Sequence, residues 1–386
     1  MRIGIVSETY PPEINGVALT VQGLAIGLAA RGHTIELVRP RQHQRSPVEP
    51  GVLVQEVRGM ALPRYPGLRM GWPAGRLLHE RWRRLPPDAL YIATEGPLGR
   101  SALRAAGRLG IPVATGFHTR FDDYAAHYGV GALAPAVRRY LCRFHRRSDA
   151  TLVPTNALAD ELRGLGVANV RVLRRAVDSA RFHPALRDAS LRTAWGADGS
   201  TPVVLYVGRI APEKNLELAV QTFRAIQQQV PGARYVWVGD GPARAALAAA
   251  HPDFLFVGTQ QGDALARHYA SADLFSFPSL SETFGNVVIE ALAAGLPVVA
   301  FDQGAAREHL QHGSNGYCIA LGDEAAFVAA AVTLAGNPGL IRHVGRAARA
   351  SIERLSPAAV LSDFENLLRG LSRGERQTHV VRIAHA

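Results

Sequence analysis

The sequence predicts an α/β protein of two doubly wound domains, each built on a parallel sheet, and three observations support this fold class. The chain has 386 residues, which is too long for one ordinary hydrophobic core and suits two domains of similar size. Hydrophobic residues make up 47% of the chain, as expected for a globular protein. Near-continuous apolar runs alternate with helical patterns, which is typical of parallel sheets covered on both faces.

The apolar runs give the strands in order. In the first half, strands are predicted at Arg2–Ser7, Thr34–Arg39, Val52–Val57, Ala89–Ala93, Pro112–Gly116, Ala150–Pro154 and Val170–Leu173. In the second half, they are predicted at Pro202–Gly208, Arg234–Gly239, Phe254–Gly258, Leu274–Pro278, Pro297–Phe301 and Gly316–Ile319. Helical patterns lie between many of them, for example at Val17–Ala30 and Pro97–Leu109.

The alternation breaks at Ala176–Asp188, which is the best candidate for a linker. We therefore expect an N-terminal domain over residues 1–180 and a C-terminal domain over residues 181–356. Residues 357–386 are expected to form a C-terminal helix, which can cross back to the N-terminal domain, and a flexible tail. Ligands of open parallel sheets bind beyond the carboxyl ends of the strands, so a cleft between the two facing domains is the expected site.

Several absences predict a cytoplasmic protein without a metal. The first strand is followed by no long apolar stretch, so no signal peptide is expected, and the longest apolar runs are too short to cross a bilayer. Cys142 and Cys318 lie far apart, which fits a reducing compartment. No Asp-x-Asp pair and no His/Cys cluster is present, so neither a metal nor a cofactor is predicted.

The positive charge is confined to the first half of the chain. The whole chain has 43 Lys plus Arg and 32 Asp plus Glu, a net charge of +11. Residues 1–180 contain 25 Arg and 14 acidic residues, so they alone account for this +11. This asymmetry predicts an anionic partner for the N-terminal domain: nucleic acid, an anionic membrane or an acidic substrate. A GC-rich genome would explain arginine in place of lysine, but not an excess in one half only.

Lys214 is the only lysine among these cations, and it follows a predicted strand in the stretch GRIAPEKN. Arg209 and Lys214 follow the carboxyl end of that strand, where they can bind a diphosphate. The arginine would make a bidentate contact with the phosphate oxygens, and the lysine would act as a compact point charge. The alternative is an exposed loop with solvated cations. Because every other cation in the chain is arginine, we infer that position 214 requires an ammonium group.

Two glutamates mark a second candidate site in SETFGNVVIEALAAGLPVVA. Glu290 interrupts an apolar helix, where a charged carboxylate needs a partner such as the vicinal hydroxyls of a ribose. Glu282 precedes this helix, and Gly285-Asn286 opens it with N–H groups that can face a polar ligand. The alternatives are an arginine partner for Glu290 and a simple N-terminal helix charge for Glu282.

Two further loops follow predicted strands. In SETYPPEINGV, Pro11-Pro12 predicts an extended loop, and Asn15-Gly16 predicts a turn where backbone can approach a ligand. In GFHTRFDDYAAHYG, His118 lies just beyond a strand, so it is either a substrate contact or only a hydrogen-bonding residue. The glycine-rich VGDGPAR turn at Val238–Arg244 is consistent with either ligand binding or turn formation.

A basic amphipathic helix is predicted at Ala134–Arg147. It carries five arginines, Arg138, Arg139, Arg143, Arg146 and Arg147, largely away from the side that contains Val137, Leu141 and Phe144. Together with Gly67–Arg84, this helix can bind an anionic lipid surface. The alternative is a core-facing helix with a solvated basic face.

In combination, these motifs resemble family 4 retaining glycosyltransferases of the GT-B type over nearly the whole chain. The resemblance is carried by Glu282-x7-Glu290 with the following AxxxGLPVVA, by the Arg209/Lys214 pair, by VGDGP and by ETYPPEINGV. The stretch beginning at Gly116 is most similar to GDP-mannose-dependent α-mannosyltransferases and related glycolipid synthases. The fold implied is two facing Rossmann-like domains with a cleft between them and a C-terminal helix.

The resemblance also implies a role for each site residue. Arg209 and Lys214 would hold the donor diphosphate, Glu290 the ribose, and Glu282 the hydroxyls of the transferred sugar. Backbone of Phe284, Gly285 and Asn286 would lie near that sugar. Gly16 would let the first loop pass close to phosphate and acceptor, and His118 would contact the sugar near its anomeric carbon. His118, Arg209, Lys214 and Glu282 are thus the predicted catalytic residues.

The implied activity is metal-independent transfer of a hexosyl group, with retention, from GDP-mannose to a lipid or glycolipid at the inner face of the membrane. One alternative is a UDP-sugar enzyme that makes a glucosyl, glucuronosyl or sulfoquinovosyl diacylglycerol. Another is a nucleotide-sugar epimerase on the same scaffold, although the paired glutamates favour transfer. A nucleic-acid binder would explain the pI of 10.3, but aromatic stacking platforms and a recognisable reading helix are missing from the sequence. The donor base, the exact sugar, the acceptor, the linkage and the oligomeric state stay open.

Overall fold

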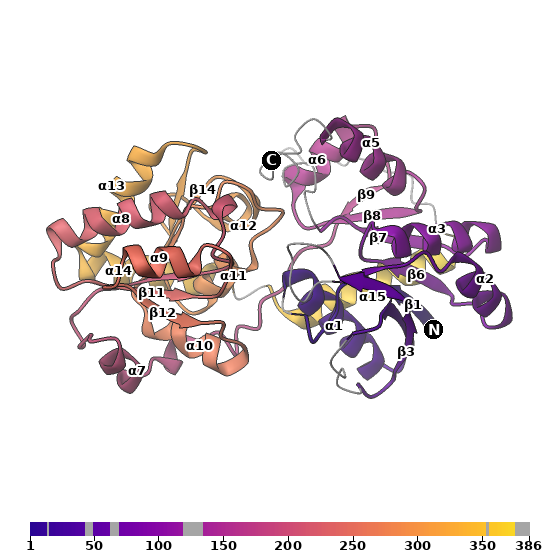
Figure 1. The fold of residues 1–386 in the computed structure, drawn as a ribbon, viewed down its shortest axis with the longest axis horizontal. Coiled ribbons are helices and arrows are strands. Elements are labelled where there is room, and N and C mark those ends of the chain that lie inside the picture. The colour runs from indigo at the N-terminus through magenta and orange to yellow at the C-terminus, as the bar shows by residue number, and fades with distance from the viewer. Residues whose placement is uncertain (14, 43–48, 62–68, 119–133, 353–354, 375–386) are drawn as a thin grey trace, which may run out of the picture. The chain divides into compact units, whose positions relative to one another are not determined.

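The structure of the chain, a computed structural model, describes residues 1–13, 15–42, 49–61, 69–118, 134–352 and 355–374 (Figure 1). The chain divides into two compact units. Unit 1 comprises Met1–Leu173 together with Ala358–Ala386, and unit 2 comprises Arg174–Pro357. Each unit is described by itself below.

Unit 1 is built on a seven-stranded parallel sheet with the strand order β3-β2-β1-β6-β7-β8-β9. Its strands are β1 (Arg2–Val6), β2 (Thr34–Pro40), β3 (Val52–Val57), β6 (Ala89–Ile92), β7 (Val113–Gly116), β8 (Ala150–Val153) and β9 (Val170–Val172). Its helices include α1 (Gly16–Ala30), α2 (Gly75–Arg84), α3 (Pro97–Leu109), α5 (Ala134–His145), α6 (Asn156–Gly164) and α15 (Pro357–Ser372). A short antiparallel hairpin of β4 (Gly59–Ala61) and β5 (Arg69–Gly71) is added, which the sequence patterns did not predict.

Successive residues of the central strands point to opposite faces, and this alternation sorts the core of unit 1 into layers. Ile3 and Tyr91 pack in one buried cluster with α1 and α15, whereas Val6 and Ile92 pack in another with α2 and α3. A smaller cluster joins α5 and α6 near the β8 end of the sheet. Both faces of the sheet are therefore covered, as the near-continuous apolar runs predicted.

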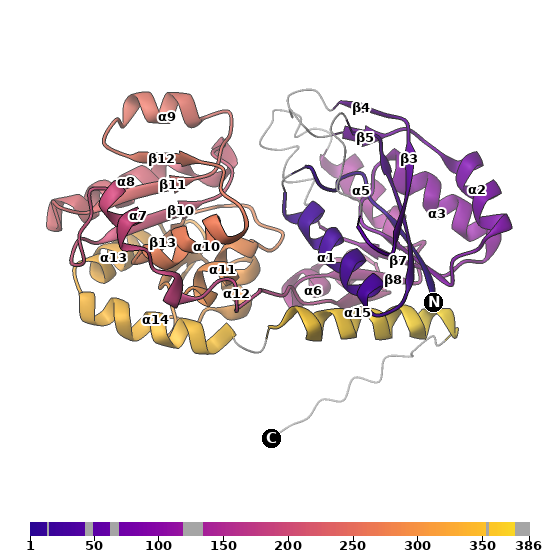
Figure 2. The same ribbon diagram turned by 90° about the horizontal axis from the view of Figure 1, so that it is seen from below.

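The C-terminal helix α15 belongs to unit 1, although it follows unit 2 in the sequence. Phe364 and Leu368 are fully buried in the cluster that contains Tyr91, and the Phe364 ring lies edge-on to the Tyr91 ring at a centroid distance of 5.0 Å. At the surface, Glu365 accepts hydrogen bonds from Arg31 at 2.8 Å and lies 3.0 Å from the His33 ring nitrogen. Figure 2 shows α15, in yellow, running beside α1.

Unit 2 is built on a six-stranded parallel sheet with the strand order β12-β11-β10-β13-β14-β15. The strands are β10 (Val203–Val207), β11 (Arg234–Val238), β12 (Leu255–Gly258), β13 (Leu274–Phe277), β14 (Val298–Phe301) and β15 (Tyr317–Ile319). The helices are α7 (Ala189–Ala194), α8 (Leu216–Gln229), α9 (Arg244–Ala250), α10 (Gly262–Ser271), α11 (Asn286–Ala293), α12 (Gly304–His309), α13 (Glu324–Ala335) and α14 (Pro338–Ile352), with short 3-10 helices at Pro184–Leu186 and Pro212–Lys214. One continuous core fills this unit.

Every strand predicted from the apolar runs is present in one of the two sheets, so the predicted α/β class with two parallel sheets is confirmed. We expected an extended loop at Pro11-Pro12, and this prediction was wrong. The segment forms a turn, in which the Glu13 amide donates a hydrogen bond to the Tyr10 carbonyl at 3.2 Å. Within the described residues, no single helix is long and apolar enough to cross a membrane, although α13 and the bent α14–α15 stretch together pass the same test of length and composition.

Replacing Phe364 by alanine is expected to destabilise unit 1 by about 3–5 kcal/mol, because it opens a cavity between α15 and the sheet. Denaturant unfolding followed by circular dichroism measures the loss. Phe364→Leu, which keeps most of the apolar volume, is expected to retain most of the stability. Unfolding of Phe364→Ala that is indistinguishable from wild type would show that α15 does not contribute to this core.

Candidate active site

The candidate residues of unit 2 lie beyond the carboxyl ends of β10 and β13, two strands that pair in the sheet. Lys214 ends the 3-10 helix that follows β10, and Glu282 lies in the loop that follows β13. The Lys214 ammonium forms an ion pair and a short hydrogen bond with the Glu282 carboxylate, and both side chains are only 14% exposed. The same ammonium lies 5.8 Å from the centroid of the Phe277 ring. The structure therefore brings together two of the residues that the sequence singled out.

Arg209 lies on the same loop as Lys214 and also has a carboxylate partner. Its guanidinium is 3.6 Å from the carboxylate of Glu213, which is buried, and its carbonyl accepts a hydrogen bond from the Tyr206 hydroxyl at 2.9 Å. The sequence did not point to Glu213, which lies between the two cations along the chain. Each cation thus has a carboxylate partner, although the Arg209 side chain is still 32% exposed.

The glycines of VGDGP have a packing role that positions the Arg209 loop. A Cβ on Gly239 would lie 1.9 Å from the Gly208 carbonyl oxygen, and one on Gly241 would lie 2.3 Å from that of Ile210. Any larger residue would push these two loops apart. Backbone hydrogen bonds then join them, from the Ile210 amide to the Asp240 carbonyl at 2.9 Å and from the Ala243 amide to the Ile210 carbonyl at 3.1 Å.

The segment from Glu282 to Asn286 is fixed by its neighbours in unit 2. The Ala305 amide, in α12, donates to the Phe284 carbonyl at 2.6 Å. Gly285 caps α11 with a φ of 87°, in the left-handed region that favours glycine. The Oδ1 atom of Asn286 is buried and has no hydrogen-bond partner among the described residues. This segment can therefore offer a polar side chain and first-turn N–H groups to a ligand.

Glu290 faces a tyrosine rather than an arginine. The Tyr269 hydroxyl, from α10, donates to the Glu290 carboxylate at 2.9 Å. Burial raises the pKa of Glu290 from 4.5 to about 7, and the hydrogen bond from Tyr269 offsets only part of this effect. Tyr269 was not predicted, because a tyrosine inside an apolar helical pattern carries no signal of its partner. A carboxylate with this environment can accept hydrogen bonds from ligand hydroxyls.

In unit 1, the loop after β1 leads into the N-terminus of α1. The Asn15 side chain caps this helix by accepting from the Ala18 amide at 2.9 Å, and Gly16 is the exposed first residue of α1. Glu8 belongs to this loop and is buried, although the sequence analysis did not single it out. Its carboxylate accepts from the Leu98 amide at 2.9 Å and the Gly71 amide at 3.3 Å, and burial raises its pKa from 4.5 to about 7.

His118 lies just beyond β7 and is held by a tyrosine of β6. Its Nε2 atom is 2.6 Å from the Tyr91 hydroxyl. A Cβ on Gly116 would lie 2.4 Å from both groups, so glycine is needed at this position for the two side chains to meet. The hydrogen bond fixes the ring orientation of His118. The following motif residues, 119–129, lie outside the described residues.

The five predicted membrane-surface arginines are all exposed on or just after α5. Leu141 and Phe144 of the same helix are buried, so the structure shows a core-facing helix with a basic outer face. Arg146 donates to the carbonyls of Leu165 and Gly166 at 2.5 and 2.8 Å and thereby caps α6. Arg138, Arg139, Arg143 and Arg147 remain the arginines of this face that an anionic surface can contact.

Most of the candidate residues belong to unit 2. A diphosphate can bind the two cations, and hydroxyl groups can bind the two glutamates, while the helix start at Asn286 supplies N–H donors. In unit 1, the sequence predicted a turn at Asn15-Gly16 followed by a helix, and in the structure Gly16 is already the first residue of α1. His118 lies just beyond a strand, as predicted. No group of three or more metal-ligating side chains lies within the described ranges.

Comparisons with known proteins agree with this geometry. Residues 14–181 match the family model Glycosyltransferase Family 4, and residues 201–337 match the model Glycosyl transferases group 1. The GDP-mannose-dependent alpha-mannosyltransferase of Mycobacterium tuberculosis is 35% identical over 328 residues, 84% of this chain and 85% of that protein. Its namesake from Mycolicibacterium smegmatis is 36% identical over 313 residues, 80% and 81% of the two chains. A sulfoquinovosyl transferase of Arabidopsis thaliana is 33% identical over 292 residues, 73% of this chain and 56% of that protein.

Solved structures show the same fold at low sequence identity. Sucrose-phosphate synthase from Thermosynechococcus elongatus superimposes with a TM-score of 0.79 at 19% identity, covering 97% of this chain and 99% of that one. WaaG, a glycosyltransferase involved in lipopolysaccharide biosynthesis, superimposes with a TM-score of 0.74 at 15% identity, covering 95% and 100%. The two parallel sheets and these likenesses confirm the predicted GT-B fold class.

Stability is expected to fall as pH rises from about 4.5 to about 7, in part because of Glu290. Its raised pKa means that the folded state holds a proton that the unfolded state releases in this window. The contribution is complete below 4.5 and is lost as pH rises through the folded pKa of about 7. Glu290→Gln stays neutral and can still accept from Tyr269, so its melting temperature should exceed that of wild type at pH 8 and change less with pH. Differential scanning calorimetry measures both, with the exposed Glu217→Gln as the control. Identical pH profiles for wild type and Glu290→Gln would contradict this assignment.

Proposed function

The chain belongs to glycosyltransferase family 4, and on that premise we propose that it transfers an α-mannosyl group from GDP-mannose to a lipid or glycolipid acceptor. That it is a hexosyltransferase follows from the family and from its curated relatives. The observation that carries the proposal is the Lys214–Glu282 pair at the ends of neighbouring strands. It unites a group suited to phosphate with a group suited to sugar hydroxyls. The donor is proposed from the mycobacterial relatives, which are named for GDP-mannose and match most of the chain.

Each site residue is assigned one part of the donor. Arg209 and Lys214 bind the diphosphate, and Glu290, oriented by Tyr269, binds the ribose. Glu282 binds hydroxyls of the mannose, next to the backbone of Phe284, Gly285 and Asn286. Gly16 and His118 are the residues of unit 1 to which the proposal assigns a role in the reaction. The hydrogen bond from Lys214 to Glu282 supports this assignment, because it fixes the position of the phosphate-binding group relative to the sugar-binding group.

The reaction keeps the anomeric configuration. The bond from the anomeric carbon to the phosphate oxygen breaks while the acceptor oxygen attacks from the same face, through an oxocarbenium-like state. The acceptor proton passes to the departing phosphate. Negative charge grows on that phosphate in the transition state, and Lys214 with Arg209 stabilises it more strongly than in the bound donor. No metal is assigned a role in this proposal.

The UDP-sugar alternative stays open because a sulfoquinovosyl transferase is also among the relatives. The test is a thermal shift with GDP-mannose, UDP-glucose and UDP-glucuronate side by side, since only a ligand that binds the folded state stabilises it. We expect the largest shift with GDP-mannose. A larger shift with a uridine donor would move the assignment to the alternative, and no shift with any of the three would contradict a nucleotide-sugar enzyme.

Lys214→Ala is expected to lower the transfer rate by about a hundredfold or more, because the charge on the leaving phosphate loses its compact partner. The loss should fall mainly on kcat rather than on the KM for the donor, as transition-state stabilisation requires. Lys214→Arg should not restore the rate, since a guanidinium cannot replace a point charge. Circular dichroism checks folding, and replacement of the exposed Arg342 of α14, as Arg342→Gln, is the control. Near-normal turnover of Lys214→Ala would remove the lysine from the mechanism.

We also propose that the protein binds the cytoplasmic face of the membrane peripherally, through the basic face of α5. Vesicle sedimentation at low salt should show more binding to anionic than to neutral vesicles, and added salt should weaken it. The triple variant Arg138→Gln/Arg139→Gln/Arg143→Gln should bind anionic vesicles less than wild type. Equal binding of wild type to both kinds of vesicle would count against the surface assignment.

A further inference from the structure

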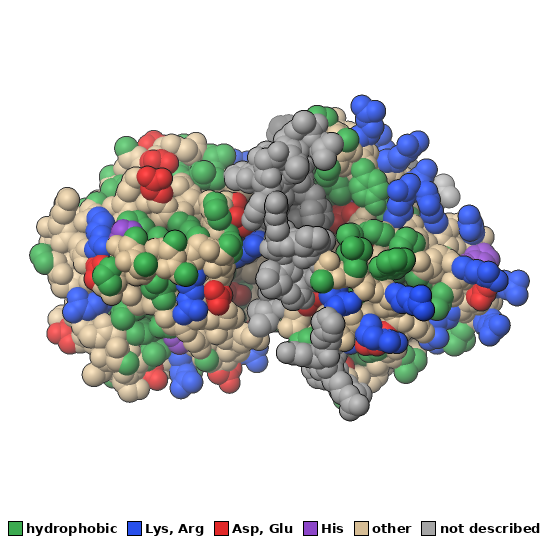
Figure 3. All heavy atoms as spheres, viewed as in Figure 1, with side chains coloured by type: hydrophobic (Ala, Val, Ile, Leu, Met, Phe, Trp, Pro, Cys, Tyr) green, Lys and Arg blue, Asp and Glu red, His purple; other side chains and the backbone are tan. Residues whose placement is uncertain are grey.

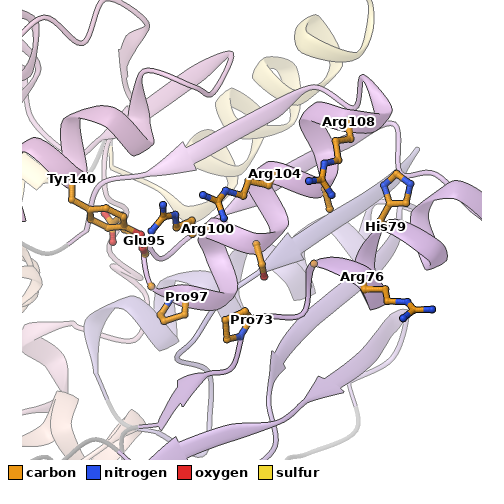
Figure 4. Close-up of a pocket in the computed structure, with 13 residues that line it drawn as sticks. Pro73, Arg76, His79, Glu95, Pro97, Arg100, Arg104, Arg108 and Tyr140 are labelled. Carbon is orange, nitrogen blue, oxygen red and sulfur yellow. Dashed lines mark hydrogen bonds between the residues drawn. The ribbon is translucent and has the colours of Figure 1, made fainter.

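A groove of about 780 Å³ lies in unit 1 between α2 and α3 (Figure 4). None of the residues predicted to bind the donor or to take part in catalysis lines it. Its volume is in the range of small-molecule binding sites. One wall is formed by α3, from which Arg100, Arg104 and Arg108 project in a row (Figure 4). Because they are four residues apart, they lie on one side of the helix, with a rise of about 6 Å from one to the next.

The outer end of the groove is cationic. His79 of α2 lies near Arg108, whereas the Arg76 side chain points away from it and pairs with Glu80 at 3.1 Å (Figure 4). Among the residues that the structure describes, no carboxylate forms an ion pair with Arg104 or Arg108. The Nδ1 atom of His79 is buried and has no hydrogen-bond partner there. Like charges one turn apart destabilise a helix, and an anion bound between them removes that repulsion.

The other end of the groove is rigid and less cationic. The Arg100 guanidinium lies over the Tyr140 ring, 5.7 Å from its centroid. The Tyr140 hydroxyl donates to the Glu95 carbonyl at 2.5 Å, and the Glu95 carboxylate is 3.2 Å from the buried His145 ring. Glu95 follows β6, so this end lies beside the carboxyl edge of the sheet, where substrates of parallel sheets bind.

Two residues that adjoin groove residues in the sequence carry exposed apolar side chains. Trp72, which precedes the groove residue Pro73, is 56% exposed, and Leu77, which follows Arg76, is 44% exposed. Tryptophan and arginine together are typical of surfaces that contact the headgroup region of a bilayer. Figure 3 shows arginine side chains gathered over the face of unit 1 that carries α2, α3 and α5. A ligand with both a phosphate and a lipid tail fits this combination better than a free anion.

We propose that the groove between α2 and α3 holds the phosphate group of a lipid headgroup, with the headgroup hydroxyls toward Glu95. The acceptor is then a phosphate-bearing glycerolipid rather than a neutral diacylglycerol. This inference rests on the proposed function, in which the enzyme glycosylates a lipid acceptor. Arg104 and Arg108 bind the phosphate, and Arg100, stacked on Tyr140, closes the groove at the edge of the sheet.

The test measures binding of the full chain to neutral detergent micelles that contain phosphatidylglycerol or diacylglycerol as a minor component. Trp72 reports binding by its fluorescence, because Trp82, Trp195 and Trp237 are at most 4% exposed. Micelles with phosphatidylglycerol are expected to bind at least about tenfold more tightly than those with diacylglycerol, as two arginines near a phosphate imply. Equal affinity for the two kinds of micelle would overturn the proposal.

A matched pair of variants tests whether the groove is responsible. Arg104→Gln/Arg108→Gln should lose about tenfold or more of the affinity for phosphatidylglycerol micelles. Arg342→Gln/Arg346→Gln, which removes two exposed arginines at the same spacing from α14, should stay within about twofold of wild type. Equal loss in both variants would show that net charge alone drives binding and would overturn the assignment to the groove.

Two further measurements separate the sources of failure. Free glycerol phosphate at the same concentration as the lipid should displace little protein from the micelles, whereas full displacement would assign the groove to soluble phosphate esters and overturn the lipid assignment. The thermal shift with GDP-mannose should be the same in Arg104→Gln/Arg108→Gln and wild type, because the donor residues of unit 2 are intact. A wild-type protein without a donor shift would contradict the proposed function itself, independently of the micelle result.

Discussion

The ion pair between Lys214 and Glu282 is the contact on which the candidate site depends. One partner follows β10 and the other follows β13, and the pairing of these two strands sets the distance between them. Close backbone packing at Gly239 and Gly241 holds the loop of Lys214, and the hydrogen bond from Ala305 to Phe284 holds the loop of Glu282. The side chains of the site are therefore positioned mainly by backbone contacts between their loops and the neighbouring loops. These contacts hold the side chains in place before a ligand binds.

Much of this arrangement can be predicted from the sequence, because the signals are local. Apolar runs locate every strand of the two sheets, and a residue type that is unusual in its surroundings, such as a lone lysine or a glutamate in an apolar helix, marks the site. The partners of these residues are not local. Tyr269 is 21 residues from Glu290, and Glu8 binds the amide of Leu98, 90 residues away. Only the fold brings such pairs together, and the three-residue strands of the β4–β5 hairpin are too short to produce a periodic signal.

Two of the glutamates with a raised pKa, Glu8 and Glu290, show why burial alone does not identify a functional group. Glu8 and Glu290 both have a pKa of about 7, and burial is the main cause in each case. Glu8 accepts hydrogen bonds from two backbone amides and so connects the loop after β1 to α3 and β5, which is a structural task. Among the described residues, only the Tyr269 hydroxyl donates a hydrogen bond to the Glu290 carboxylate. The carboxylate oxygens can therefore accept further hydrogen bonds. The difference lies in their hydrogen-bond partners rather than in the pKa.

The positive excess of unit 1 is concentrated on particular helices. Arginines with acidic partners occur in both units, such as Arg31 with Glu365 in unit 1 and Arg192 with Asp273 in unit 2. In unit 1, α3 and α5 contain arginines but no Asp or Glu at all, a composition that α14 of unit 2 shares. Acidic residues cost nothing extra on an exposed helix and would stabilise it through pairs one turn apart. Their absence from α3 and α5 leaves the exposed side of each helix positive, and a negatively charged lipid surface can neutralise that charge.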